Sequence, residues 1–189
     1  MKNIVIFASG RGSNAEKIIN HFRNHKRVKI SAIVSNKLDA GVLDLALRNG
    51  IPTRVLSKKV FFKSTDILNY LKEKETDLIV LAGFLWLIPP HLVEAYPDKI
   101  INIHPALLPK YGGKGMYGHH VHKAVKAAGD TISGITIHYV NEHYDEGRHI
   151  AQFSTELNAD MNPDDIAAAV LKLEHQHFAE TIEKVLLTD

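Results

Sequence analysis

The sequence predicts an α/β protein with a Rossmann-like, open twisted sheet that is mostly parallel, with an antiparallel hairpin at one edge and helices on both faces. Two observations lead to this prediction. Short apolar runs alternate with amphipathic stretches through about the first half of the chain, which favours a parallel sheet with right-handed crossovers. Two later apolar runs, at residues 132–140 and 149–156, follow one another with little between them, which indicates a hairpin.

The first half of the chain is expected to form strands separated by helices. The predicted strands are Asn3–Ala8, Val28–Ser35, Thr53–Leu56 and Asp77–Ala82, and the predicted helices are Ala15–Asn24, Ala40–Asn49 and Lys63–Lys74. Gly50 closes the second helix. Ile67, Leu68 and Leu71 give the third helix an apolar side. The segment Gly83–Pro90 is expected to be a loop that leads into a short helix.

The second half begins with a short buried strand, Lys99–Ile103. A glycine-rich stretch, Tyr111–Gly118, precedes a predicted helix, two strands and a final helix. These four elements are predicted at His119–Ala128, Ile132–Val140, His149–Glu156 and Pro163–Leu187. The final helix has Asn162 or Asp164 near its cap and Pro163 in its first turn, a position that proline favours.

Composition and charge narrow the class of protein. A length of 189 residues suits a single domain, 1–189, with a sizeable core. The formal net charge of +2 is spread along the chain, so neither a nucleic acid nor a membrane is expected as a partner. The absence of cysteine excludes disulfides, thiol nucleophiles and thiolate metal sites. No apolar run approaches membrane-spanning length and no signal peptide is recognised, so a cytoplasmic location is expected.

The most informative stretch is Asn102-Ile103-His104-Pro105, at the end of the short buried strand. Alternation places the Asn102 amide and the His104 imidazole on the same face of that strand. Pro105 cannot continue the ladder, so both side chains should lie at the carboxyl end, where ligands bind in open parallel sheets. An amide can donate to an oxyanion, and an imidazole can donate or transfer a proton. An ordinary strand-to-loop turn is the alternative.

The loop Gly10–Ala15 fits the pattern G-x-G-x-x-G/A between a strand and a helix. The acidic residue that would bind a ribose is missing after the second strand, where Ser35-Asn36-Lys37 stands, so NAD is disfavoured and NADP through Lys37 stays open. Backbone N–H groups at a helix start hold anions in every version of this loop. A phosphate site is therefore expected, with Ser13 and Asn14 as further donors and a purely structural turn as the alternative.

The remaining polar residues carry weaker signals. Asp145, in the loop between the last two strands, could charge an imidazole opposite and raise its pKa, whereas His138 is interpreted as a structural residue. The chain has 12 histidines, and His119 and His122 would share a helix face. No carboxylate stands at a suitable helical spacing, so a solvated face is favoured over a metal site. The same interpretation applies to the histidines of the last helix, His175 and His177.

Four motifs occur in a fixed order: GRGSN at 10–14, LAGF at 81–84, NIHPALLP at 102–109 and DEG at 145–147. Together they cover nearly the whole chain, and the set resembles the phosphoribosylglycinamide formyltransferase family, folate-dependent enzymes of purine synthesis. The resemblance implies transfer of the formyl group of 10-formyltetrahydrofolate to the amine of glycinamide ribonucleotide. The products would be formylglycinamide ribonucleotide and tetrahydrofolate, in de novo purine (IMP) biosynthesis. It implies these two small-molecule substrates and no metal, and it is compatible with a homodimer.

The resemblance also implies roles for individual residues. The family's three catalytic positions match Asn102, His104 and Asp145. The ribonucleotide site matches Gly12, Ser13, Asn14 and Glu174. The folate pocket matches Leu85, Trp86, Leu87, Ile88, Asn102, Val140, Asn141 and Tyr144. The half at about 1–100 would thus bind the nucleotide phosphate, and the half at about 100–189 would carry catalysis and folate binding.

The chain departs from the family's pattern at three places. Trp86 stands where many members have arginine, and Arg148-His149 replaces apolar or proline residues. Val60 stands where many members have a basic residue for the folate tail, and Lys59 or Lys63 is the expected substitute.

Other functions remain to be weighed. The Asn-His-Asp set also resembles methionyl-tRNA formyltransferase, which has a C-terminal RNA-binding domain, and formyltetrahydrofolate hydrolase, which has an N-terminal regulatory domain. Both are disfavoured because we expect no room for such a domain in 189 residues. A non-catalytic nucleotide-binding module built on the Gly12 loop is the alternative from a different class. Such a module would not need Asn102, His104 and Asp145 together.

Overall fold

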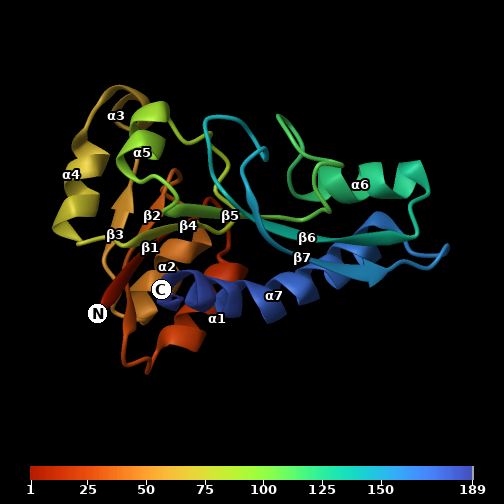
Figure 1. Cartoon of the computed structure of the whole chain (residues 1–189), viewed down its shortest axis with the longest axis horizontal. Coiled ribbons are helices and arrows are strands. Elements are labelled where there is room, and N and C mark those ends of the chain that lie inside the picture. Colours follow the sequence, from red (N-terminus) through yellow and green to blue (C-terminus); the bar gives the residue numbers. More distant parts are fainter. Residues whose placement is uncertain (189) are drawn as a thin grey trace.

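The computed structural model describes residues 1–188 as a seven-stranded sheet flanked by helices (Figure 1). The strands are β1 (Lys2–Phe7), β2 (Val28–Ser35), β3 (Thr53–Val55), β4 (Leu78–Leu81), β5 (Ile100–His104), β6 (Ile132–Tyr139) and β7 (His149–Glu156). The helices are α1 (Ser13–Phe22), α2 (Gly41–Arg48), α3 (Lys58–Lys63), α4 (Asp66–Glu73), α5 (Pro90–Ala95), α6 (His119–Ala128) and α7 (Pro163–Leu187). None of these helices combines the length and the apolar character that crossing a bilayer requires.

The strand order across the sheet is β3-β2-β1-β4-β5-β6-β7. Strands β1 to β5 pair in parallel, whereas β6 runs antiparallel to β5 and β7 antiparallel to β6. The predicted fold class, including the antiparallel hairpin at one edge, is therefore confirmed.

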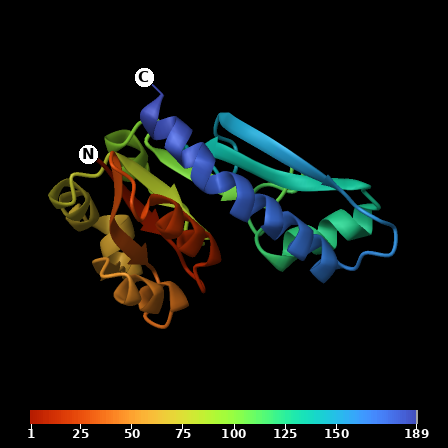
Figure 2. The same cartoon turned by 90° about the horizontal axis from the view of Figure 1, so that it is seen from below.

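Helices cover both faces of the sheet. In Figure 1, α3, α4 and α5 lie above the sheet and α1, α2 and α7 below it, and Figure 2 shows α7 running obliquely along the lower face. Side chains of β1 alternate between two apolar cores. Ile4 and Ile6 belong to the core shared with α1, α2 and α7, and Val5 and Phe7 belong to the core shared with α3, α4 and α5. All four are fully buried, so the apolar run in the sequence reflects a strand covered on both faces.

The predicted elements agree with the structure except around residue 63. The bounds of β2, α6, β7 and α7 are those predicted, and the other paired ends differ by one or two residues, as helix and strand ends commonly do. The predicted helix Lys63–Lys74 is wrong at its start, because α4 begins at Asp66 and a separate helix, α3, precedes it. Ser57 caps α3 through the Val60 N–H, and Ser64 is extended and ends it. Six residues with one fully buried side chain, Phe61, are too few to show a helical period.

The chain order brings two loops together at the carboxyl ends of the central strands. From β1 the chain moves outward to β2 and β3, then returns to β4 on the other side of β1. The loops that leave β1 and β4 start side by side and then turn away from each other. They open a crevice, which is the usual ligand site of such sheets. Ser9 joins the two loops, because its N–H donates to the Gly83 carbonyl at 3.0 Å and its hydroxyl accepts from the Leu85 N–H at 3.0 Å.

Candidate active site

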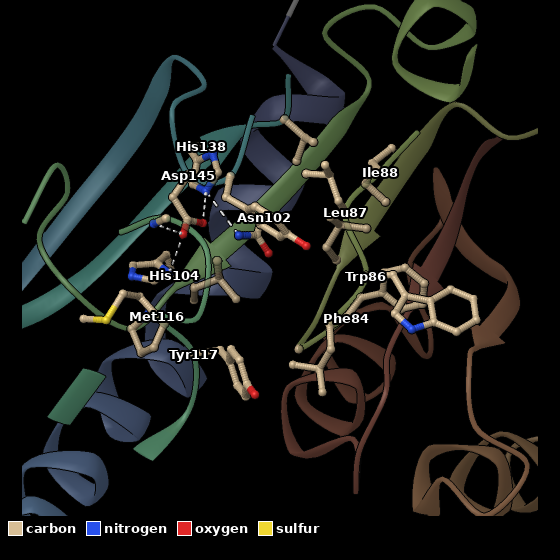
Figure 3. Close-up of a pocket in the computed structure, with 18 of the residues that line it drawn as sticks. Phe84, Trp86, Leu87, Ile88, Asn102, His104, Met116, Tyr117, His138 and Asp145 are labelled. Carbon is tan, nitrogen blue, oxygen red and sulfur yellow. Dashed lines mark hydrogen bonds and ion pairs between the residues drawn. The ribbon is translucent and has the colours of Figure 1, made fainter. Parts of the chain in front are cut away.

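A cavity of about 610 Å³ lies at this crevice. Figure 3 shows Asn102, His104, His138 and Asp145 on one wall and Phe84, Trp86, Leu87 and Ile88 on the other. The predicted site residues that line it are Asn14, Leu85, Trp86, Leu87, Ile88, Asn102, His104, Val140, Tyr144, Asp145 and Glu174. The others, Gly12, Ser13 and Asn141, lie outside the lining, and the Asn141 side chain instead accepts from the His143 N–H at 3.0 Å.

His104 ends β5 with both ring nitrogens facing acceptors. The side chain is buried, with Nε2 2.7 Å from the Tyr111 carbonyl oxygen and Nδ1 3.5 Å from Asp145 Oδ2. A carbonyl oxygen can only accept, so Nε2 carries a hydrogen. Nδ1 then faces a carboxylate that also only accepts. Both contacts are satisfied together when the ring is doubly protonated, which suits it to donate a proton or to stabilise negative charge.

Burial decides the pKa of His104 in the free protein. Loss of hydration lowers this pKa most, while the Asp145 carboxylate and the Tyr111 carbonyl raise it and His138 lowers it further. The net pKa lies below the ordinary value. Asp145 thus raises the pKa of an imidazole opposite, as predicted, but in the free protein burial has the larger effect. Burial alone would raise the pKa of Asp145, yet the His138 hydrogen bond, the His104 charge and the Gly113 N–H together lower it.

His138 is a site residue that sequence reasoning missed. Its Nδ1 donates to the Tyr139 carbonyl at 2.9 Å, and when the ring is neutral its Nε2 accepts from Asn102 Nδ2 at 3.1 Å. This bond sets the orientation of the Asn102 amide and leaves its second N–H for a ligand. Only the register of the two strands could have indicated this role, because Asn102 pairs directly with His138 across β5 and β6. Asp145 Oδ1 lies 3.7 Å from the same Nε2.

The first turn of α1 lies next to the cavity, which Asn14 lines. Gly12 has φ +86° and would place a Cβ 2.7 Å from Val42 Cγ2, so this turn requires glycine. Within residues 1–188 no side chain caps the N-terminus of α1, so its first N–H groups are free to bind an anion. Asn14 Nδ2 donates to Glu174 Oε2 at 2.6 Å and joins α1 to α7 at the cavity. Burial raises the pKa of Glu174, against the lowering effect of Asn14.

The apolar wall packs against α3, the helix that was not predicted from the sequence. Trp86 packs with its ring centroid 5.6 Å from that of Phe61 and 5.7 Å from that of Phe62, both on α3. Phe84 lies between β1 and this cluster, 5.2 Å from Phe7. Trp86 therefore contributes to a continuous aromatic wall where many family members place an arginine. Arg148, the second departure, lies outside the lining, 4.2 Å above the Tyr139 ring and 3.3 Å from Asp98 Oδ1.

The histidine-rich helix is only partly solvated. His122 is buried, so the prediction of a solvated face is wrong for this residue, whereas His119 is exposed and lies 3.5 Å from Asp164 Oδ1. In α7, His175 is half-buried and His177 stacks on Phe153 at 3.7 Å, so neither belongs to a fully solvated face. Among residues 1–188, no three histidine or acidic side chains are grouped to hold a metal ion.

Comparison with known proteins identifies the family. The formyl transferase family model matches residues 2–182. The chloroplastic phosphoribosylglycinamide formyltransferase of Arabidopsis thaliana is 42% identical over 187 residues, which are 96% of this chain and 64% of that protein. This chain thus spans less than two thirds of that plant protein. The phosphoribosylglycinamide formyltransferase of Bacillus subtilis is 35% identical over 98% of this chain and 95% of its own length.

A solved structure agrees with these sequence relationships. The crystal structure of phosphoribosylglycinamide formyltransferase from Anaplasma phagocytophilum has a TM-score of 0.90 at 32% identity. The match covers 99% of this chain and 87% of that one. The chain therefore belongs to the formyl transferase family.

Proposed function

We propose that the protein transfers the formyl group of 10-formyltetrahydrofolate to the amine of glycinamide ribonucleotide, a step of de novo purine (IMP) biosynthesis. The observation that carries the proposal is the convergence of Asn102, His104 and Asp145 in one cavity beside the start of α1. The similarity to the phosphoribosylglycinamide formyltransferases of Arabidopsis thaliana and Bacillus subtilis supports the same substrate. A module that only bound nucleotides would not need these three side chains together.

The polar wall suits the chemistry of formyl transfer. The amine attacks the formyl carbon, and the carbonyl oxygen becomes an oxyanion in a tetrahedral intermediate. The free N–H of Asn102 would donate to this oxygen. The Nδ1–H of a doubly protonated His104 would also donate, because it is 3.5 Å from Asp145 Oδ2 and can turn to a closer acceptor, whereas Nε2 stays on the Tyr111 carbonyl. Each donor is worth about 3–4 kcal/mol. Negative charge that develops beside His104 favours its protonated form, which burial disfavours in the free protein. The stabilisation therefore appears mainly in the transition state, as catalysis requires.

The reaction is completed by transfer of one proton between the two substrates, so no further reagent is needed. The attacking amine loses a proton, and the folate nitrogen gains one as the bond between it and the formyl carbon breaks. Asp145 lies between two imidazoles, 3.5 Å from His104 Nδ1 and 3.7 Å from His138 Nε2. We propose that Asp145 passes the proton from the attacking amine to the folate nitrogen and keeps His104 oriented.

The two substrates would meet at the polar wall. The proposal puts the ribonucleotide phosphate at the first turn of α1, with Gly12, Ser13 and Asn14, and the ribonucleotide against Glu174. The pterin would lie against the wall formed by Leu85–Ile88, with Val140, Asn141 and Tyr144 opposite. Holding the amine and the formyl carbon in contact would convert a two-molecule encounter into a reaction within one complex.

A double substitution tests the phosphate site. Ser13→Ala with Asn14→Ala should raise KM for the ribonucleotide about tenfold or more and leave KM for the folate within about twofold, because side-chain donors to one substrate are lost. Steady-state kinetics with each substrate varied in turn measures both values. If neither KM changes, the phosphate binds elsewhere, and Lys114 in the cavity lining is the next position to test.

A panel of acceptors tests the proposed function. Purified protein with 10-formyltetrahydrofolate should form formylglycinamide ribonucleotide when glycinamide ribonucleotide is supplied. It should show at most slow release of formate with water alone and no formylation of methionyl-tRNA. Turnover confined to water or to the tRNA would favour the other formyl-folate enzymes. Ribonucleotide binding without turnover would favour a non-catalytic module. A cytoplasmic location and a homodimer stay predictions.

A further inference from the structure

Tyr111, in the loop after β5, connects His104 to a charged pair away from the cavity. Its carbonyl oxygen accepts from His104 Nε2 at 2.7 Å. Its hydroxyl donates to Asp130 Oδ2 at 2.8 Å, and Lys110 Nζ donates to the same oxygen at 3.2 Å. Neither Tyr111 nor Asp130 lines the active cavity, and both line a second cavity of about 360 Å³. One residue therefore contacts the imidazole through its backbone and the carboxylate through its side chain.

The backbone of Tyr111 adopts a conformation that must be held. Its φ is 57°, in the left-handed region that bulky L residues rarely occupy. Such a conformation persists only where the surroundings fix it. Two contacts do so here, because the ring packs against the buried core and the hydroxyl is bound to Asp130. The direction of the carbonyl follows from the backbone, so the side-chain contacts also fix the acceptor that His104 meets.

We propose that Tyr111 and Asp130 are positioning residues for His104, with Asp130 holding the Tyr111 side chain so that the Tyr111 carbonyl stays on Nε2. Without the hydroxyl contact, Tyr111 can relax toward a negative φ and turn its carbonyl away. The imidazole then loses one of the two contacts that orient it. The inference rests on the proposed function for its kinetic readout only.

The charges around His104 give the proposal a readout that loss of stability would not produce. Asp145 and His138 face the ring from the neighbouring loop and strand, and His122 faces it from α6. The Tyr111 carbonyl and Asp145 raise the pKa of His104 against the effect of burial. Loss of the carbonyl contact should therefore lower this pKa further while Asp145, His138 and His122 remain in place.

Tyr111→Phe removes the hydroxyl and keeps the ring. We expect a lower pKa for His104 in an NMR titration of the ¹⁵N-labelled free protein. We also expect kcat to fall about tenfold, with KM for both substrates within about twofold, because the reacting groups bind but are less well placed. Asp130→Ala should act in the same way. Asp130→Asn keeps an oxygen that can accept from Tyr111, so most of kcat and the His104 pKa should be retained.

Lys110→Met is the matched control, because it removes the other partner of Asp130 and leaves the Tyr111 bond intact. It should behave as wild type. An unchanged His104 pKa and kcat in folded Tyr111→Phe and Asp130→Ala would overturn the proposal. If Tyr111→Phe does not fold, the proposal is tested by comparing the His104 pKa and kcat of Asp130→Ala with those of Asp130→Asn. Equal values in the two variants would overturn it. If wild type transfers no formyl group, the proposed function fails, while the titration still decides the positioning.

Discussion

Asp145→Asn is expected to lower kcat about a hundredfold to a thousandfold, with much smaller changes in KM, because the transition state loses a properly charged donor at His104. The protein should still fold. Asp145 has φ 58°, a conformation that asparagine tolerates, and the amide oxygen can still accept from the Gly113 N–H, now at 2.9 Å from Asp145 Oδ2. Circular dichroism and steady-state kinetics on the same preparation separate loss of catalysis from loss of structure. A kcat within threefold of wild type would contradict the role of Asp145.

The same variant should change the pH profile. The Asp145 carboxylate raises the pKa of His104, so its removal lowers that pKa further. The protonated fraction of His104 falls as pH rises through its pKa, and the activity that needs the imidazolium should therefore be lost at lower pH than in wild type. Asp98→Asn is the matched control, since Asp98 also has a positive φ, 53°, but lies exposed and pairs with Arg148. It should leave the profile unchanged.

Asn102→Ala is expected to lower kcat about a hundredfold to a thousandfold by removing one donor to the oxyanion. His138 orients the Asn102 amide through the 3.1 Å contact, so His138→Ala should give a smaller loss of the same kind. The substrates would still bind, and KM should change little. Asn20→Ala, on the exposed side of α1, is the control for removing an amide. Full activity in Asn102→Ala would show that the oxyanion is stabilised by other groups.

The fold was predictable because its signals are local. Strands buried on both faces, such as β1 and β4, appear as continuous apolar runs, and Pro163 with Asn162 marks the start of α7, where the structure shows a capping box. Helix α3 gave no such signal, since it is a single short stretch whose Phe61 packs into an aromatic cluster assembled from distant segments. Packing of that kind depends on the tertiary structure and not on periodicity.

The candidate site was predictable to the extent that strand geometry fixes it. Alternation along β5 placed Asn102 and His104 on one face, and both line the cavity. The contributions of His138 and Tyr111 depend on strand register and on loop closure, which the sequence does not encode locally. The net pKa of His104 likewise depends on how deeply the folded protein buries it, and that burial outweighs the neighbouring carboxylate.

A double-mutant cycle on kcat/KM for formyl transfer, with His104→Ala, Asp145→Asn and the two combined, tests most directly whether these side chains act as one catalytic unit. Residues that act together give non-additive losses. We expect similar losses for the two single variants and little further loss in the double variant, with all three folded by circular dichroism. Losses that multiply fully in the double variant would contradict a single catalytic unit, because His104 and Asp145 would then contribute independently.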